Sequence, residues 1–505
     1  MDGLLQALPL ALSLEGLLFT LIGTTLGILV GSIPGLSGTM LIALTLPLTF
    51  TMSPALALMM LVGMYVGSVA GGLISATLLR MPGTPASVLT TLDGYPMARS
   101  GRPGRALALG IAASFVGGLV SWVALIFVSR PLADFALRFT PWDYFAFIMV
   151  AMVLIASLSR GAMVKGLLSG FLGILIAMPG SDPSTGMPRL TFGNRAMENG
   201  FDVLPVLIGL FAVSQIMRGL TEHLGAAERI EIRRERVTLS FADWRRHGGN
   251  MLRSSTLGTL IGILPGVGAN VGSVVAYSTA RSFSKEPERF GTGSEEAVIA
   301  SEAGNSATVG GALVPLVAIG IPGSVIDAIL IGGLYLHGIV PGPMLFSTNP
   351  DVVYAIMISC LVATLMMFVL MTGLVRHLPK LARVDRSLLL PAILVFCIVG
   401  SYAATNRFFD VWVMLAFGLL GFLLEKARVP LAPLVIGFIL GPLAEAKLRT
   451  GLMITAGDPS PLVTQPLPAF LLGIALILLL WPLLSKLLPQ RIKPGARPAG
   501  GSGPA

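Results

Sequence analysis

Charged side chains are scarce in this sequence. Only 12% of the 505 residues are charged, whereas about 25% is usual for soluble domains. Residues 16–79 contain no charged side chain at all. Since a membrane-crossing helix needs about 20 apolar residues, this stretch alone is long enough for about three crossings. The composition excludes an ordinary soluble domain.

Other uncharged runs follow along the whole chain. They cover 106–129, 254–280, 303–326, 352–375, 387–406 and 459–485, with shorter runs at 144–159, 203–217, 411–424 and 429–444. A transmembrane β-barrel would instead alternate apolar and polar residues over segments of about 10 residues. The sequence therefore predicts an all-α polytopic membrane protein with about 12 transmembrane helices and additional broken or re-entrant helices.

Residues that carry enzyme chemistry are also few. The two cysteines, Cys360 and Cys397, both fall in apolar runs and indicate no structural disulfide. The four histidines are scattered, and neither a metal-ligand spacing nor a G-x-S-x-G nucleophile elbow occurs. We expect a protein that is not an enzyme and that needs no cofactor.

The basic residues gather in hydrophilic loops. The net charge is +9, and positively charged loops of membrane proteins normally stay in the cytoplasm. This placement explains the charge without nucleic acid, so we expect contacts with membrane lipid and none with nucleic acid. Residues 221–250 form the largest hydrophilic stretch between apolar blocks and are predicted to be a cytoplasmic linker. The first 16 residues lack a basic start and a cleavage site, so we expect the first apolar segment to be retained.

Two stretches on either side of this linker are alike. Residues 27–40 read GILVGSIPGLSGTM and residues 258–271 read GTLIGILPGVGANV, with glycines and a Pro-Gly pair in register. Weaker matches follow in the same order: 71–83 with 310–323, 166–176 with 416–426, and 204–213 with 467–476. They predict two internal repeats, which we expect to be inverted, as in many secondary transporters.

The predicted domains follow from this duplication. The first transmembrane repeat covers 1–220, the cytoplasmic linker 221–250 and the second repeat 251–488. Residues 489–505 have the composition of a disordered tail.

The Pro-Gly pairs are the first candidate site. A helix broken within a membrane must be buried in protein or line a wet cavity, because lipid offers no hydrogen bonds. The half-helix that starts after the break presents free N–H groups and suits a carboxylate, and the carbonyls before it suit a small cation such as Na⁺, close to Gly35 and Gly266. The candidate substrate-binding residues are Pro34, Gly35, Ser37, Gly38, Thr39, Pro265, Gly266, Gly268, Asn270 and Ser273.

A second pair of breaks has the same character. MPGTPAS (81–87) and IPGSVID (321–327) supply the candidate residues Pro82, Gly83, Thr84, Ser87, Pro322, Gly323 and Ser324. Glycines at 27, 31, 258 and 262 have an equally good structural explanation, since G-x-x-x-G spacing lets helices approach closely.

Ionisable and amide side chains in apolar surroundings are candidates for ion coupling. Glu302 is followed by 24 uncharged residues, and Asn305 and Ser306 lie on its helical face if the segment is helical. Asp327 closely follows the second break of the second half. Structural anchoring is the alternative role for Glu302. An ionisable group inside a membrane protein is a functional candidate by default.

Several longer motifs carry a resemblance to a known family. They are PGLSG (34–38), LPLTF (46–50), PGTPAS (82–87), LDGYPMARSGRPGRALALG (92–110), DPSTGMPRLTFG (182–193), LPGVGA (264–269), SEAGNSA (301–307), GIPGS (320–324), LHGIVPGPMLF (336–346) and LGPLAEAKLR (440–449). On these motifs, from about residue 15 to 485, the chain resembles the large permease subunit of the tripartite tricarboxylate transporter family.

The resemblance implies a permease of the bacterial cytoplasmic (inner) membrane. It implies a small membrane subunit and a periplasmic solute-binding protein as partners, and an organic carboxylate as substrate, driven by Na⁺ or H⁺. Two positions depart from the family pattern: Ser306 stands where a second asparagine is usual, and Asp327 where a small or hydroxyl residue is usual. The alternative function is an ion-coupled carrier or a channel for another small anion that acts without a binding protein.

Overall fold

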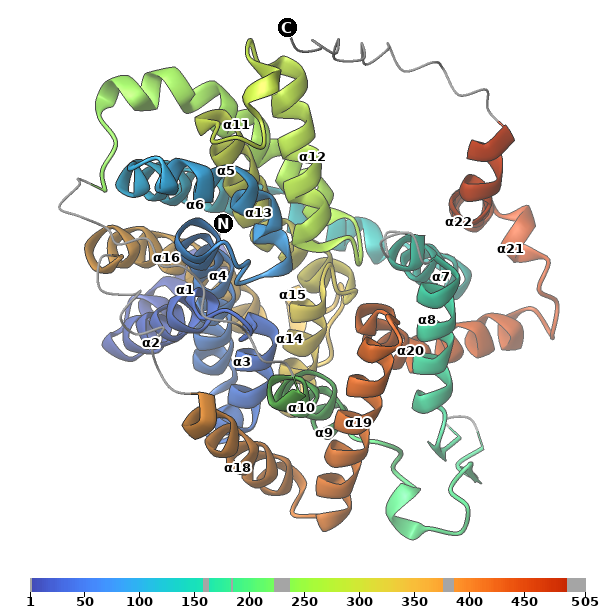
Figure 1. Ribbon diagram of the computed structural model, residues 1–505. Helices are drawn as coiled ribbons and strands as arrows, with labels where there is room; N and C mark the ends of the chain where they lie inside the picture. Colours follow the sequence, from blue (N-terminus) through green and yellow to red (C-terminus); the bar gives the residue numbers. More distant parts are fainter. Residues whose placement is uncertain (1, 158–162, 183–184, 222–236, 376–385, 488–505) are drawn as a thin grey trace, which may run out of the picture.

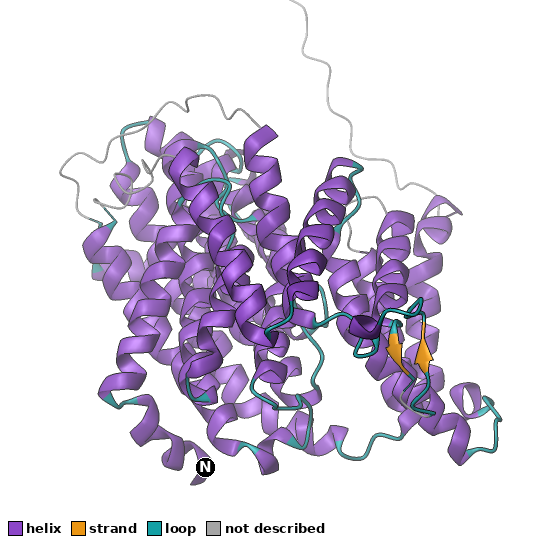
Figure 2. Cartoon of the chain, turned by 90° about the horizontal axis from the view of Figure 1, so that it is seen from below, coloured by secondary structure: helices purple, strands orange, loops and turns teal. Residues whose placement is uncertain are grey.

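The chain folds almost entirely into helices (Figure 1). The computed structural model describes residues 2–157, 163–182, 185–221, 237–375 and 386–487. Within these ranges the only strands are β1 (Gly180–Ser181) and β2 (Pro188–Arg189), which pair antiparallel. They lie at the side of the helix bundle (Figure 2).

Seven helical stretches among the described residues are long and apolar enough to cross a membrane. They are α2 (Leu14–Ser32), α4 (Pro54–Leu79), α6 (Pro103–Ala136), the continuous run of α9 (Val203–Ile208), η4 (Gly209–Val213) and α10 (Ser214–Thr221), α16 (Pro350–Leu374), α19 (Phe408–Lys426) and α20 (Leu431–Ile454). Shorter apolar helices accompany them. The protein is thus an all-α polytopic membrane protein, as predicted, while the number of about 12 crossings stays a prediction.

The remaining elements are shorter or less apolar. They are α1 (Asp2–Ala11), α3 (Gly38–Thr45), η1 (Leu46–Thr51), η2 (Pro85–Ser87), α5 (Val88–Arg99), α7 (Pro141–Ser157), α8 (Met163–Ala177), η3 (Arg195–Met197), α11 (Phe241–Ile263), α12 (Gly268–Phe283), η5 (Pro287–Arg289), α13 (Glu295–Ile319), α14 (Val325–Leu336), α15 (Leu345–Thr348), α18 (Arg386–Thr405), α21 (Pro461–Thr464) and α22 (Pro466–Leu487). Within the predicted linker 221–250, α11 begins already at Phe241, and residues 222–236 lie outside the described part, as does the predicted tail 489–505.

Helix α2 and the segment after it form a hairpin. Gly27 lies against Met64 and Gly31 against Ser68, so α2 and α4 run parallel. The chain between them, α3 and η1, must therefore return toward the end at which α2 began. The turn of this hairpin is the Pro34-Gly35 break, where Gly35 has φ 86°.

The break after α4 meets this hairpin turn. Helix α4 ends at Arg80 in the left-handed region, with φ 54°. The chain then folds back until Gly83 touches the carbonyl oxygen of Gly31. Two interrupted segments thus come together beside α4, with only backbone and small side chains between them.

The second half builds the same sequence of elements. Gly258 lies against Gly304 and Gly262 against Thr308, so α11 and α13 also run parallel, and α12 returns between them. The N–H of Gly266 donates to the carbonyl of Pro322 at 3.2 Å. Here too the two breaks touch.

Helix α6 fixes the relative direction of α4 and α13. Leu73 lies against Gly110, and Val66 shares a small cavity with Ser114 and Gly118, so α4 and α6 run antiparallel. Gly117 lies against Ala303 and Ser121 against Gly310, so α6 and α13 run parallel. It follows that α4 and α13 are antiparallel.

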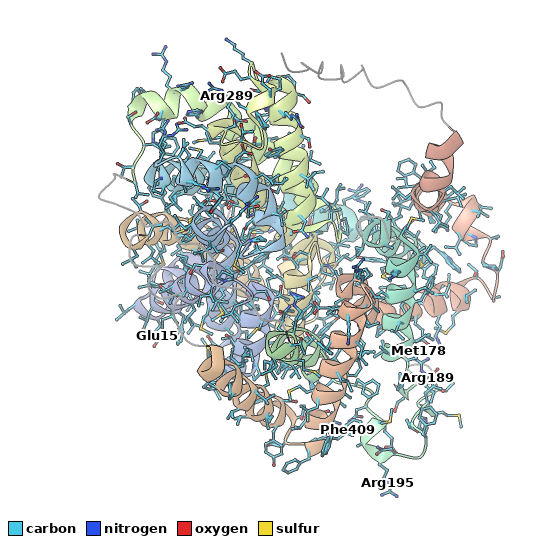
Figure 3. All side chains as sticks on the ribbon, viewed as in Figure 1. Glu15, Met178, Arg189, Arg195, Arg289 and Phe409 are labelled. Carbon is cyan, nitrogen blue, oxygen red and sulfur yellow. The ribbon has the colours of Figure 1, made fainter. Side chains whose placement is uncertain are left out.

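Two lateral helix groups flank these elements. Helices α7, α8, α20 and α22 pack together at the right of Figure 1, and α9, α10, α18 and α19 pack together at its lower edge. Ion pairs with α20 hold the non-helical segment that follows α8 and carries β1 and β2. Arg189 donates to the carbonyl of Met178 at 2.7 Å and to Glu445 Oε2 at 2.7 Å, and Arg449 lies 2.7 Å from Asp182 (Figure 3).

Charged residues tie three helix starts together at the end of the molecule that carries the linker. Arg105 lies 2.7 Å from Asp243 and 3.0 Å from Glu295, and so joins α6, α11 and α13. The hydrogen bonds from Arg105 and Ser240 hold the pKa of Asp243 well below its usual range. These carboxylates are therefore ionised at neutral pH and keep the three starts in register.

The close helix packing leads to a first prediction. We expect Gly31→Ala to lower the amount of folded protein, because the new methyl group would overlap the backbone oxygen of Ser68. Such overpacking costs about 1–3 kcal/mol. Gly373→Ala is the matched control, since this helical glycine has open space around it. Size-exclusion chromatography of detergent extracts measures the yield; equal yields of the two variants would contradict this explanation of the glycine spacing.

Candidate functional site

The four breaks meet in two pairs across the molecule. The start of α12 packs against η2 and α5, and the start of α3 packs against α14. We call the first pair the cavity face and the second pair the closed face. Each face thus combines one break from each half of the chain.

On the closed face both helix starts are capped by side chains. Ser37 accepts the N–H of Met40 at 3.1 Å at the start of α3. Ser324 accepts the N–H of Asp327 at 3.3 Å at the start of α14 and also bonds Tyr65 at 3.0 Å. Side-chain caps satisfy N–H groups that would otherwise need a ligand. Each cap pairs one of the free N–H groups of its helix start, so these two starts offer fewer N–H groups to an anion than an uncapped start does.

Asp327 is the exceptional residue of the closed face. Its side chain is fully buried, and within the described residues neither carboxylate oxygen accepts a hydrogen bond. Ser324, the hydroxyl next to it, is bonded instead to the N–H of Asp327 and to Tyr65. A buried carboxylate without a partner is very costly, and this cost favours a protonated or cation-bound Asp327.

On the cavity face the helix starts have no side-chain caps. Val267 at the start of α12 and the residues before η2 and α5 provide none. Thr84 and Ser87 bond each other at 2.7 Å instead. The N–H groups of the first turn of α12 therefore remain available, and with the positive end of the helix dipole they suit an anion.

A cavity of about 780 Å³ opens at these uncapped starts. It is bounded by Gly266 and Asn270 of the α12 start, by Ala86 and Val88 near α5, and by Ile155 of α7. Its polar rim consists of Arg218, Glu425 and Arg428. Arg218 lies in the last turn of α10, just before the linker, so the rim lies at the linker end of the molecule. A cavity of this size accommodates a small organic acid.

The Pro34-Gly35 turn has much less space. The cavity beside it measures about 20 Å³ and is lined by Gly35, Met40, Gln215 and Leu390, among others. The two Pro-Gly turns therefore do not share one cavity. The structure is open beside Gly266 and closed beside Gly35.

Glu302 is held by hydroxyl groups from the first half of the chain. It is fully buried and accepts hydrogen bonds from Thr90 at 2.5 Å and from Ser114 at 3.4 Å. Ser273 donates to the carbonyl of Ser301 at 3.1 Å and so fastens α12 to α13. These bonds favour an anchoring role for both side chains.

Asn305 and Ser306 are buried, and their side chains form no hydrogen bond in the described part of the chain. Ser306 lines an internal cavity of about 10 Å³ together with Ser114, Ser121 and Thr364. That space is close to the smallest that holds one water molecule. Buried polar groups without a partner are rare in proteins, so Asn305 and Ser306 stay candidates for contact with a water molecule or a small ion.

A dedicated transition-metal centre is not formed by the described residues, which contain no cluster of three His, Cys, Asp or Glu side chains. The oxygens near Gly35 and Gly266 are carbonyls and hydroxyls, which are the ligands of hard cations. The predicted Na⁺ positions at these turns stay predictions.

Sequence reasoning missed Tyr65, Thr90, Arg218 and Arg428. Tyr65 and Thr90 form hydrogen bonds with residues that lie more than 200 positions away in the chain. No local sequence pattern predicts such contacts. A polar aromatic residue within the long uncharged run was the available signal for Tyr65. The two arginines sit at helix ends, where the sequence indicated only cytoplasmic loops.

A family model matches the sequence of the chain over residues 17–436. The model is that of the tripartite tricarboxylate transporter TctA family. The chain belongs to this family. The match covers all four breaks of the cavity face and the closed face. As a TctA-family protein the chain is a component of a membrane transporter, and the tripartite family implies further subunits.

Two relatives from Agrobacterium vitis are similar to this TctA-family chain. One is described as an uncharacterized 52.8 kDa protein in the TAR-I ttuC' 3' region; it is 36% identical over 484 residues, which cover 96% of each chain. The other is described as an uncharacterized protein in the TAR-II ttuC' 3' region; it is 35% identical over 234 residues, 46% of this chain and 97% of the relative. No solved structure matches the chain significantly.

Proposed function

We propose that this chain is the large permease subunit of a binding-protein-dependent secondary transporter in the bacterial cytoplasmic membrane. It imports organic di- or tricarboxylates by cation symport, together with a small membrane subunit and a periplasmic solute-binding protein. The observation that carries the proposal is the 780 Å³ cavity at the uncapped start of α12. A carboxylate binds there to the N–H groups of the first turn and to Asn270.

The order and direction of the helices support the proposal of inverted repeats, and with it alternating access. The parallel pairs α2–α4 and α11–α13 follow the same order of elements, and α4 and α13 run antiparallel. The packing of the lateral helices suggests a better alignment of the two repeats than the sequence match of 204–213 with 467–476. PVLIG (205–209) and PLVIG (433–437) occupy equivalent places, because Gly209 lies against α19 and Gly437 against α8. If the closed face opens while the cavity face closes, the substrate site becomes accessible from the opposite side of the membrane.

Asp327 is the coupling residue in this proposal. Its buried, unpartnered carboxylate takes up one positive charge, H⁺ or Na⁺, on the closed face while the carboxylate substrate binds on the cavity face. Glu302 serves as an anchor between the halves rather than as a second coupling site, because Thr90 and Ser114 already satisfy it. Different groups for cation and anion, on two breaks that the Gly266–Pro322 hydrogen bond joins, fit a symporter better than a channel, which needs one continuous selective pore.

Reconstitution tests the proposed function. Proteoliposomes with this chain and the small membrane subunit are placed under an imposed ion gradient. They should show saturable uptake of labelled citrate or succinate only after the binding protein is added. Uptake that is equally strong without the binding protein would favour the alternative of an independent anion carrier. Uptake that does not saturate would favour a channel.

A further inference from the structure

Arg428 stands at the rim of the cavity with an unusual backbone conformation. It follows the last turn of α19 and has φ 56°, in the left-handed region. Glycine is strongly preferred at this position after a helix, because a side chain is strained there. The chain nevertheless carries an arginine. Its guanidinium is exposed at the cavity and forms no hydrogen bond or ion pair with other residues of the described ranges.

The other charges of the rim largely compensate each other. Arg218 lies 3.2 Å from Glu425, and both side chains also line the cavity. The positive charge of Arg428 is therefore the one that the described rim residues leave unmatched. The cavity is thus lined both by a guanidinium that has no partner among the described residues and by an uncapped helix start. Two such groups suit a ligand with two negative charges.

We propose that Arg428 recognises a second carboxylate of the substrate, while the start of α12 holds the first. This inference rests on the proposed function and adds to it a basis for selectivity. A monocarboxylate engages only the α12 start and gains nothing from Arg428. Di- and tricarboxylates span the cavity and gain a charge-assisted, bidentate pairing with the guanidinium. Arg218, which lies 3.2 Å from Glu425, offsets the negative charge of that carboxylate in the cavity lining.

The left-handed backbone conformation of Arg428 allows its side chain to be removed without destabilising the fold. Arg428→Gly removes the guanidinium and at the same time relieves backbone strain, so the fold should be at least as stable as before. We expect the apparent Kd for succinate to rise by about tenfold or more, the size of a lost charge-assisted pairing. The apparent Kd for propionate should stay within about twofold of wild type, since it reports contacts at α12 alone.

The assay is competition against labelled succinate with the purified full-length chain and its membrane partner in detergent. Arg428→Gln is the second variant, which loses the charge but keeps the strained residue type. Lys426→Gln is the matched control, because it removes an exposed positive charge two residues away that does not line the cavity. The control should bind both ligands as wild type does.

Two results would overturn the inference. One is an unchanged succinate affinity in both Arg428 variants, and the other is an equal loss for succinate and propionate or the same loss in Lys426→Gln. Failure of the proposed function looks different, because the wild-type protein itself would then bind no carboxylate.

Discussion

Asp327→Asn is expected to abolish ion-driven accumulation of substrate while leaving substrate exchange across the membrane intact. Asparagine keeps the shape of the side chain but cannot carry the charge that a bound H⁺ or Na⁺ compensates. If one positive charge accompanies each substrate, its loss removes about 2.3 kcal/mol of driving force per 100 mV. The accumulation ratio at that potential should therefore fall by about 50-fold.

The measurement compares net uptake with counterflow in the same proteoliposomes. Counterflow needs substrate movement but no net ion movement, so it separates coupling from transport. Asp351→Asn is the control, because this carboxylate is exposed at the start of α16 and lies outside both faces. Accumulation by Asp327→Asn at the wild-type level would show that the coupling charge is bound elsewhere.

The class of the protein could be predicted from the sequence because membrane solvation acts on composition. Long runs without charge, such as 16–79, have no other stable environment, and the structure places α2, α3 and α4 there. Breaks at Pro-Gly were also predictable, since proline removes a donor and Gly35 and Gly266 both need positive φ. Local chemistry was sufficient for these features.

The pairing of the breaks could not be predicted, because it depends on contacts between the halves. The sequence suggested that the two Pro-Gly turns form one site. In the structure the α3 start instead meets α14, and the α12 start meets α5. Capping then makes the faces different: Ser37 and Ser324 satisfy the closed face, whereas Val267 leaves the α12 start open. A single side chain at each turn thus changes how many N–H groups the helix start leaves unpaired.

Ser273 and Glu302 illustrate the same limit in another way. Both looked like ligands for substrate or ion, since polar groups in apolar runs are costly. The structure gives Ser273 the carbonyl of Ser301 and gives Glu302 the hydroxyls of Thr90 and Ser114. A polar residue that finds partners within the protein has no need of a ligand. Asp327 has no such partner among the described residues, which is why we propose it, rather than Glu302, as the coupling residue.

Gly266→Leu should eliminate transport while the protein still inserts into the membrane. Gly266 has φ 71°, and a side chain there would run into Ile155 and fill the cavity in front of the α12 start. The substrate would lose its charge-assisted hydrogen bonds to the helix start, which corresponds to a loss of about 10- to 100-fold in affinity. Gly266→Ala should have a smaller effect, because one methyl group fills less of the cavity than leucine does, although the Ile155 side chain must still turn away from a Cβ that would overlap its Cγ1. Succinate binding to solubilised protein measures both variants.

Backbone strain must be separated from blockage of the cavity, because leucine is unfavourable at positive φ by roughly 1–2 kcal/mol wherever it stands. Gly101→Leu provides the comparison: Gly101 has φ 87° and open space around it, between α5 and α6. Both leucine variants should therefore lose stability through strain, measured as thermal aggregation temperature, with a further loss in Gly266→Leu from the overlap with Ile155. Only Gly266→Leu should lose binding. Normal binding by Gly266→Leu would remove the cavity face from the transport path, and a loss in both variants would attribute the effect to strain. The alternative site would then be the closed face, where Asp327 still requires a positive partner.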